Sequence, residues 1–235
     1  MPEDADGTAV GTTDELLCRG PWFAGLPRPL RERILAAART RTFEKGEVIG
    51  LEGCTPAGMS AVLSGSVKLV RQVHEGDESL LFIGEPGFWF GEFAVLTGER
   101  TLVSAIAKTR TRVLMLPKRA FDCIVEDDPL SYRHFATLGL ARASIFLMAY
   151  THASSLEPEA RLRGQLALLS HLKHDGHDVD AAVELPYSQT ELASIVGVSR
   201  QTINHLLRGL VAKGLIEQGF GRVRVLAPRA LLAGL

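Results

Sequence analysis

Residues 189–208 constrain the fold more strongly than any other part of this chain. Ala193 is small enough for two helices to cross closely over it, and Gly197 stands where the chain must turn sharply with a positive φ. Residues that suit the capping of a helix start precede each half of the stretch: Ser188 with Glu191, and Ser199. The stretch therefore predicts two short helices joined by a tight turn, which is a helix-turn-helix.

The second helix of this pair has a polar side. Its residues follow an i, i+1, i+4, i+5, i+8 spacing and are Arg200, Gln201, Asn204, His205 and Arg208. Arginine, glutamine and asparagine can form paired hydrogen bonds with base edges in the major groove of DNA. A helix that enters the groove by its N-terminus brings Arg200 and Gln201 closest to the bases. The alternative is an ordinary amphipathic helix pair with a solvated polar face.

Two short runs with strand-like alternation follow, at residues 215–218 and 222–226, and a Gly-Phe-Gly turn separates them. They predict a hairpin, or wing, packed beside the second helix. Arg222 and Arg224 are placed to reach DNA phosphates, and ordinary strand-surface charge is the alternative. The residues expected to contact DNA are Ser188, Thr190, Ser199, Arg200, Gln201, Asn204, His205, Arg208 and Arg222.

The distribution of charge is consistent with a DNA-binding C-terminal part. The chain of 235 residues is long enough for two modest domains, and its formal net charge is -1. Residues 160–235 hold 9 Lys+Arg against 6 Asp+Glu, a net of +3, whereas residues 1–159 hold 17 against 21, a net of -4. The small positive surplus therefore lies with the helix-turn-helix.

The sequence indicates a cytoplasmic protein. Its first residues are acidic and small, without the basic and apolar segments of a signal peptide. The longest apolar run, residues 143–150, is far shorter than the ~18–20 residues that a membrane span needs. Cys18, Cys54 and Cys123 are widely spaced and odd in number, which favours a reducing compartment over a disulfide scaffold. For Cys54, an exposed redox thiol is the alternative to a plain small residue.

The chain before the helix-turn-helix changes texture along its length. Residues 1–14 are rich in Gly, Thr, Ala and acids and are expected to be disordered, and residues 15–40 suggest one or two short helices. From residue 42 to about residue 116, short strand-like runs alternate with glycines, which predicts an antiparallel β barrel or roll. The runs lie at residues 59–63, 66–70, 79–83 and 112–116. The expected fold class is therefore α+β.

A long helix is expected after the β region, with Asp128 and Pro129 at its start. Side chains that can form a narrow seam recur along it at three- and four-residue steps, namely Leu138, Ala141, Ile145, Met148 and His152. Such a seam predicts a coiled-coil dimer, and a helix packed against its own barrel is the alternative.

Several segments together resemble those of a known family. They include residues 21–26, 43–49, 62–68, 87–92, 185–193 and 198–203. The family is the cyclic-AMP receptor protein / fumarate-nitrate regulator (CRP/FNR) group of bacterial transcription factors. The resemblance implies an effector-binding β roll at residues 15–126, a dimerisation helix at 127–156 and a winged helix-turn-helix domain at 157–235. It also implies a homodimeric activator that binds a pseudo-palindromic operator in double-stranded DNA and contacts RNA polymerase.

The resemblance also assigns roles in the DNA-reading stretch. Arg200 matches the family arginine that contacts guanine. Gln201 stands where the family often has a glutamate that accepts a hydrogen bond from cytosine, and His205 replaces a further family arginine. We therefore expect an operator that differs from the best-known half-site of the family.

The effector pocket implied by the resemblance departs from the family pattern. Gly91 and Glu92 are kept, but the Arg-Ser pair that holds the cyclic phosphate aligns with Thr101 and Leu102, with Arg100 next to them. A buried phosphate without a paired cation is costly, so we do not expect cyclic AMP to act in the usual manner. The residues expected at the pocket are Gly91, Glu92, Phe93, Arg100, Thr101, Leu102, Phe146 and Leu147, the last two replacing polar groups that meet adenine.

Other signals remain open at this point. One alternative is a cyclic nucleotide held by a rearranged phosphate site, and another is a redox- or haem-sensing regulator, with haem at His74 or His152. The iron–sulfur members of the family carry a cysteine cluster near the N-terminus, where this chain has only Cys18, so no such cluster is expected. Aromatic and apolar residues that either fill the pocket or belong to the ordinary core are Phe88, Trp89, Phe90, Phe146 and Leu147, and we expect at least two to be core.

Neither a metal site nor an enzyme is expected. Residues with some character as metal ligands are His171, His174 and His177, with Asp175, Asp178 and Asp180, but their spacing fits a solvated turn better. The sequence has no Ser-His-Asp order, Walker loop or His-Glu-x-x-His segment. The competing class, a ligand-sensing module without a DNA role, is disfavoured by the capped helix-turn-helix.

Overall fold

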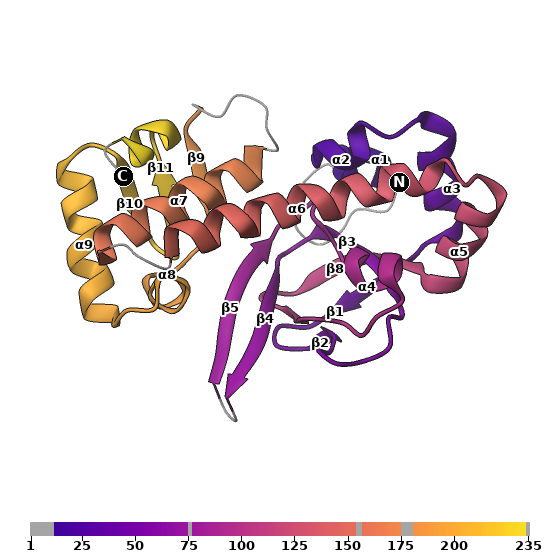
Figure 1. Cartoon of the computed structure of the whole chain (residues 1–235), viewed down its shortest axis with the longest axis horizontal. Coiled ribbons are helices and arrows are strands. Elements are labelled where there is room, and N and C mark those ends of the chain that lie inside the picture. The colour runs from indigo at the N-terminus through magenta and orange to yellow at the C-terminus, as the bar shows by residue number, and fades with distance from the viewer. Residues whose placement is uncertain (1–11, 75–76, 154–156, 175–180, 234–235) are drawn as a thin grey trace. The chain divides into compact units, whose positions relative to one another are not determined.

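The computed structural model describes residues 12–74, 77–153, 157–174 and 181–233 (Figure 1). The chain forms two compact units. The first consists of Met1–Gln72 and Phe82–Gly139, and the second consists of Val73–Leu81 and Leu140–Leu235. Within the described residues, no helix is long and apolar enough to cross a membrane.

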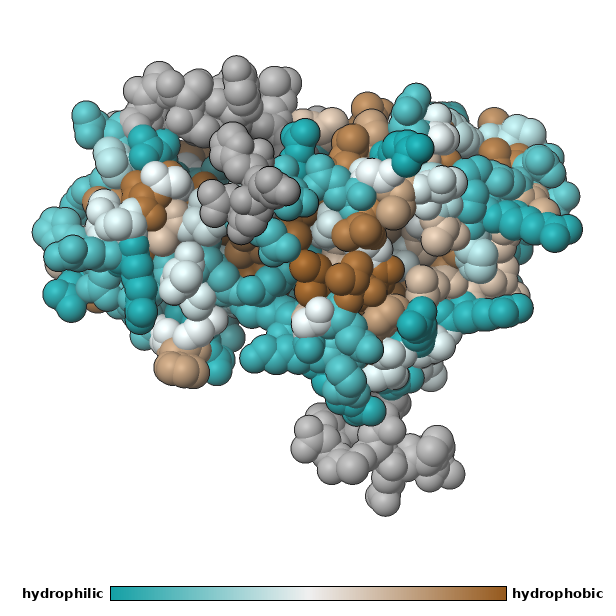
Figure 2. All heavy atoms as spheres, turned by 90° about the horizontal axis from the view of Figure 1, so that it is seen from below, coloured by the Kyte–Doolittle hydropathy of each residue, from teal (hydrophilic) through white to brown (hydrophobic). Residues whose placement is uncertain are grey.

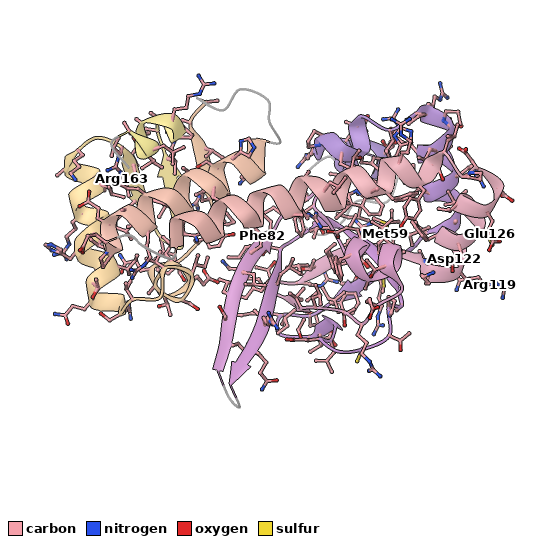
Figure 3. All side chains as sticks on the ribbon, viewed as in Figure 1. Met59, Phe82, Arg119, Asp122, Glu126 and Arg163 are labelled. Atoms are coloured by element: carbon pink, nitrogen blue, oxygen red, sulfur yellow. The ribbon has the colours of Figure 1, made fainter. Side chains whose placement is uncertain are left out.

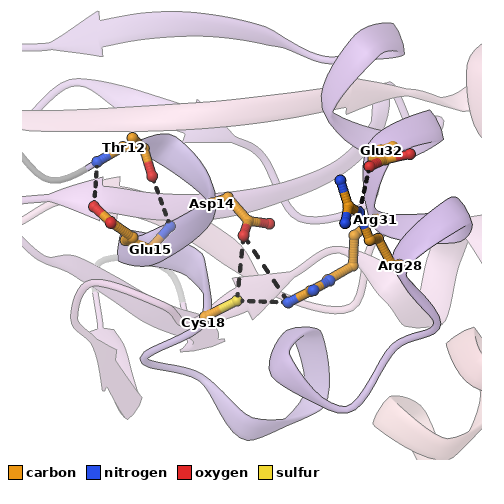
Figure 4. Close-up of polar contacts among 7 residues, drawn as sticks. All are labelled: Thr12, Asp14, Glu15, Cys18, Arg28, Arg31 and Glu32. Atoms are coloured by element: carbon orange, nitrogen blue, oxygen red, sulfur yellow. Dashed lines mark hydrogen bonds and ion pairs between the residues drawn. The ribbon is translucent and has the colours of Figure 1, made fainter.

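The first unit begins with three short helices, α1 (Thr13–Leu17), α2 (Pro21–Ala24) and α3 (Arg28–Ala37). Thr12 and Glu15 form a capping box at the start of α1 (Figure 4). Sequence analysis suggested one or two helices from residue 15, so the expected disorder of residues 1–14 is wrong for Thr13 and Asp14. Local capping explains the difference, because it satisfies the free amide groups of the first turn.

The β region forms two four-stranded sheets, whose strands belong to the first unit except for residues 73–81 of the β4–β5 hairpin. One has the order β1-β8-β3-β6 and the other β2-β7-β4-β5. Strand pairs β1–β8, β3–β8, β3–β6, β2–β7 and β4–β7 run antiparallel. The strands are β1 (Arg39–Phe43), β2 (Val48–Gly50), β3 (Gly58–Ser64), β4 (Val67–His74), β5 (Asp77–Gly84), β6 (Trp89–Phe90), β7 (Ser104–Ala107) and β8 (Thr111–Pro117). The predicted antiparallel β roll is therefore confirmed.

Two apolar cores hold this unit together. One packs α1–α3, β3 and the later helices around Trp89, and it includes Phe23, Phe135 and Met59, the last of which is labelled in Figure 3. The other contains Phe90 with apolar residues of both sheets. Trp89 and Phe90 enter different cores because neighbouring residues of a strand point to opposite faces. Both are therefore core residues, as expected for at least two of the aromatic and apolar candidates.

Three further helices follow β6 along the chain, namely α4 (Glu92–Thr97), α5 (Lys118–Asp127) and α6 (Ser131–Ala153). The first unit contains α4, α5 and the part of α6 up to Gly139. The long helix α6 begins at Ser131 rather than at Asp128, which instead ends α5. Residue 129 is a proline, and it disfavours a helical conformation at the residue before it, so the two helices separate at this point. The boundary expected at residues 127–128 is therefore wrong by three to four residues.

The second unit contains α7 (Pro158–His174), β9 (Val183–Leu185), α8 (Gln189–Val196), α9 (Arg200–Ala212), β10 (Ile216–Gly219), β11 (Arg222–Val225) and the short 3-10 helix η1 (Pro228–Leu232). Its sheet has the order β10-β11-β9, with both pairs antiparallel. Arg163 of α7, labelled in Figure 3, donates hydrogen bonds to the carbonyl groups of Leu231 and Ala233. These bonds fasten the C-terminal turn to α7. The fully buried core of the second unit includes Leu162, Leu166, Leu207 and Leu210.

Candidate nucleic-acid interface and effector site

The helix-turn-helix is built from local capping and one left-handed residue. The Ser188 backbone N–H donates to Glu191 Oε2 at 2.8 Å, and the Glu191 N–H donates back to Ser188 Oγ at 3.3 Å. Gly197 ends α8 with φ 70° and ψ 44°, and a Cβ there would meet no atom within 4 Å. Glycine is thus favoured by backbone conformation rather than by space. Ser199 caps α9 by accepting from the Thr202 N–H at 3.1 Å, so the predicted caps and turn are confirmed.

The two helices are locked by a small apolar core. The buried residues of this contact are Leu192, Ala193, Val196, Ile203 and Leu207. One polar contact also joins the helices, because the Asn204 Nδ2 donates to Gln189 Oε1 at 3.0 Å. Sequence reasoning assigned Asn204 to DNA and missed this link. The available signal was one side-chain amide on each helix, Gln189 and Asn204. Their pairing can be recognised only once the crossing of the two helices is known.

The opposite face of α9 is open. Ser199, Arg200, Gln201, His205 and Arg208 are exposed, as is Thr190 in α8, whereas Ser188 and Asn204 are half-buried. Side chains of different length and chemistry thus line one side of a capped helix. Such a surface can form hydrogen bonds with base edges, while the helix N-terminus favours a phosphate. Contact of these residues with DNA stays a prediction.

The wing is a hairpin with a two-residue loop. β10 pairs with β11 from Ile216↔Val225 to Gly219↔Arg222, and Phe220 and Gly221 form the loop, the latter with φ 68°. A third strand, β9, adds to β11 and was not predicted, although the alternating Val-Glu-Leu segment was a signal for it. The predicted wing itself is confirmed.

The two wing arginines are paired with acidic residues of neighbouring strands. Arg222 Nη1 lies 3.0 Å from Glu184 Oε1, and Arg224 Nη1 lies 3.4 Å from Glu217 Oε2. All four side chains are more than half exposed, so each pair contributes little to stability. The pairs can therefore exchange for phosphate contacts at small cost. The sequence analysis did not predict the role of Glu184, because it did not predict the strand β9 that carries this residue.

The candidate effector site begins at the junction of β6 and α4. Gly91 has φ 88°, and a Cβ there would lie 2.9 Å from the Gly58 carbonyl oxygen, so both conformation and close approach require glycine. Glu92 is 7% exposed, which places a carboxylate inside the roll unit. Phe93, by contrast, is 45% exposed and turns away from the core.

Arg100 and Thr101 hold a loop. Arg100 Nη1 donates to the Gly53 carbonyl at 2.6 Å, and Thr101 Oγ1 donates to the Leu51 carbonyl at 2.5 Å. The Cys54 N–H also donates to Thr101 Oγ1 at 3.1 Å. Leu102, the next residue, is 54% exposed and brings no hydrogen-bonding side chain. The Arg100 and Thr101 side chains are thus both engaged with the backbone of residues 51–54.

Other predicted site residues are placed less completely. Leu138 is 8% exposed and packs in the first unit's own core, which favours the alternative of a helix packed against its own barrel at this position, and its place in a dimer seam stays a prediction. Ala141 is exposed. Side chains that lie outside the described residues are those of Ile145, Phe146, Leu147, Met148 and His152 in α6, and of His174, Asp175, His177, Asp178 and Asp180. Among the side chains that are described, no group of three or more His, Cys, Asp or Glu could hold a metal ion.

These features define a regulator with a cyclic-nucleotide-binding-like β roll and a winged helix-turn-helix. A family model of the cyclic nucleotide-binding domain matches residues 40–128, and a model of the Crp-like helix-turn-helix domain matches residues 161–233. The chain belongs to the CRP/FNR family and is a DNA-binding transcription regulator. Regulators of this family bind DNA through the helix-turn-helix and typically dimerise.

Individual relatives agree with this assignment. The chain is 31% identical over 206 residues to the Cyclic AMP receptor protein of Thermus thermophilus, covering 87% of this chain and 92% of that one. It is 29% identical over 196 residues to the transcriptional regulator SdrP of the same organism, covering 82% and 92%. The crystal structure of another CRP/FNR transcriptional regulator from that organism is similar at 27% identity and a TM-score of 0.56, covering 83% and 96%. The redox- or haem-sensing alternative is not favoured by these relatives.

Proposed function

We propose that this regulator acts as a homodimer on a pseudo-palindromic operator and activates transcription by contacting RNA polymerase. The observation that carries the DNA-reading part is the capped α8–Gly197–α9 unit with Arg200, Gln201, His205 and Arg208 exposed on one side. A two-fold dimer presents two such helices to half-sites about one turn of duplex apart. The protein acts by binding, without catalysis, in the cytoplasm where its DNA lies.

Each part of the chain is proposed to carry one role. We propose residues 15–126 for effector binding, residues 127–156 for dimerisation and residues 157–235 for DNA binding. The proposed dimer seam comprises Leu138, Ala141, Ile145, Met148 and His152. Support comes from α6, where Leu140 is 66% exposed and Ala141 is also exposed in the single chain. Exposed apolar side chains on a long helix favour pairing with a second copy.

The effector is proposed not to be cyclic AMP bound in the usual manner. The Arg100 guanidinium and the Thr101 hydroxyl are bonded to backbone carbonyls of residues 51–54, and Leu102 offers no donor. A cyclic phosphate would have to displace these contacts to gain a cation. The cyclic AMP named for the Thermus relative keeps a second candidate open, a cyclic nucleotide in a rearranged site. Calorimetric titration with cyclic AMP tests this, and saturable binding at micromolar concentration would favour the second candidate.

The operator is found by selecting bound duplexes from a random pool, with and without cell extract. Arg200→Ala is then titrated against the selected operator and its single-base variants. We expect a loss of about 1–3 kcal/mol that is confined to one base position, because a paired contact to a base edge is removed. Arg229→Ala, an exposed arginine of η1, serves as the control and should leave binding unchanged. Equal weakening on every sequence would reassign Arg200 to a phosphate contact.

A further inference from the structure

The tip of the wing carries a large aromatic side chain in full contact with water. Phe220 is 103% exposed, and it stands between Gly219 and Gly221 in the two-residue loop of the β10–β11 hairpin. Loops of this length favour asparagine, aspartate or glycine at the position of Phe220. The turn therefore gains nothing from a phenylalanine, and the ring takes no part in the packing of the unit.

The position of Phe220 is fixed to the recognition helix. The Leu215 N–H donates to the Leu210 carbonyl at 3.0 Å, which joins the end of α9 to the wing. The Leu226 N–H donates to the Leu215 carbonyl at 3.0 Å and closes the base of the hairpin. Ile216, Val223 and Val225 are buried beneath it. The loop is thus carried on a packed hairpin, so a duplex bound by α9 meets the wing in a defined position.

Two guanidinium groups near the loop become available to a polyanionic partner when their exposed ion pairs exchange. Arg222 directly follows the loop and Arg224 lies two residues further on the same exposed face of β11. Their carboxylate partners, Glu184 and Glu217, form exposed pairs that exchange readily. A single ring beside two exchangeable guanidinium groups suits a nucleic-acid groove. It does not form the extended apolar patch that a protein interface needs.

We propose that Phe220 is an apolar wedge that enters the minor groove of the duplex beside the major groove read by α9. This inference rests on the proposed DNA-binding function. Apolar side chains that enter a minor groove unstack a base step in part and bend the duplex, and nearby arginines hold the flanking phosphates. Such a wedge favours base steps that unstack easily, so Phe220 adds sequence preference outside the bases that α9 contacts.

The test compares the full-length chain with Phe220→Asn and Phe220→Leu on the selected operator. Phe220→Asn gives the turn its preferred asparagine–glycine pair and removes the wedge, whereas Phe220→Leu keeps an apolar wedge. Leu232→Ala, an exposed apolar residue of η1, is the matched control. Affinity, salt dependence and thermal unfolding are measured. The fluorescence of 2-aminopurine, placed at each flanking base step in turn, reports unstacking.

For Phe220→Asn we expect an unchanged or raised Tm and a roughly tenfold loss of operator affinity, the size of one lost stacking contact. The salt dependence of operator affinity should stay unchanged because no charge is altered. The rise in 2-aminopurine fluorescence that wild type causes at one flanking base step should be absent. Phe220→Leu should retain most of the affinity, and Leu232→Ala all of it.

Several outcomes would overturn the wedge. The wedge is rejected if Phe220→Asn and wild type bind the operator with equal affinity and neither raises the 2-aminopurine fluorescence at a flanking base step. That outcome leaves the DNA-binding function intact. A fall in Tm that accounts for the lost affinity makes Phe220 a structural residue. A defect seen only when RNA polymerase is added assigns the ring to a protein partner. A wild-type chain that prefers no duplex sequence under any effector condition rejects both the wedge and the proposed function.

Discussion

At the residue scale, Arg100 and Thr101 show how side-chain hydrogen bonds can hold a loop of the β roll in place. Both side chains donate to backbone carbonyls of residues 51–54 and so stabilise a loop of the β roll. Thr101 is doubly used, since its hydroxyl also accepts from the Cys54 N–H. A phosphate would have to displace these contacts to reach the hydroxyl, which supports our proposal that cyclic AMP is not bound here in the usual manner.

Thr101→Val should therefore lower the free energy of unfolding by about 0.5–1.5 kcal/mol, because the side-chain hydrogen bonds to the loop are lost without a large change in volume. Urea unfolding followed by tryptophan fluorescence measures this, since both tryptophans lie in the roll unit. Thr40→Val, at an exposed position of β1, is the control and should have almost no effect. If the free energy of unfolding of Thr101→Val equals that of wild type, water replaces the lost side-chain hydrogen bonds to the loop.

At the element scale, the strand β9 governs the charge of the wing. Its Glu184 lies directly opposite Arg224 in the strand register and forms the ion pair with Arg222. Together with Glu217 it neutralises the exposed face of β11 in the free chain. If the wing arginines contact DNA as proposed, phosphates must compete with these carboxylates for the same guanidinium groups. We therefore propose that the strand limits sequence-independent affinity and leaves discrimination to α9.

Removing one carboxylate should release this competition. Glu184→Gln is expected to raise affinity for random duplex DNA and to steepen the slope of log K against log salt by up to about 0.9, the value for one added phosphate contact. Fluorescence anisotropy over a range of salt concentrations gives both quantities. Glu157→Gln makes the same charge change at an exposed position before α7 and should alter neither. An unchanged slope for Glu184→Gln would mean that Arg222 does not reach a phosphate.

At the scale of the whole molecule, α6 belongs to both compact units. Its residues up to Gly139 are part of the first unit, where Leu138 is buried, and those from Leu140 onward are part of the second. In the dimer that we propose, this shared helix would carry a preference of the roll for one dimer arrangement to both DNA-binding domains. A ligand shifts that equilibrium only by its difference in affinity for the two states.

Ile145→Asp should abolish dimerisation and operator binding together, because a carboxylate would be buried in the proposed seam. We expect operator affinity to fall by roughly 100-fold or more, since binding of two linked half-site readers becomes binding of one. Analytical ultracentrifugation and operator titration check the two effects. Thr137→Asp introduces the same charge at an exposed position of the same helix and should remain dimeric. A monomer that still binds the operator tightly would refute the seam.

How far sequence predicts this protein depends on the range of the interactions. The caps at Ser188 and Ser199, the turn at Gly197 and the glycine-separated strands were predicted because each depends on residues a few positions apart. Three contacts were not predicted, because each joins segments that are distant in sequence. They are the hydrogen bond between Asn204 and Gln189, the ion pair of Arg222 with Glu184, and the hydrogen bond from Thr101 to the Leu51 carbonyl. The candidate DNA face was thus largely predicted, and its internal partners were not.

The amino-acid sequence by itself determined the order of elements and the helix-turn-helix, because capping, backbone conformation and hydrophobic periodicity are local properties. Only the tertiary structure decided what the polar residues do within that frame. It turned Arg100 and Thr101 to the loop and paired the wing arginines. It also placed Leu138 in a core while Phe220 stayed in water. The physical reason is that a side chain's partner depends on which distant segments packing brings within a few ångströms.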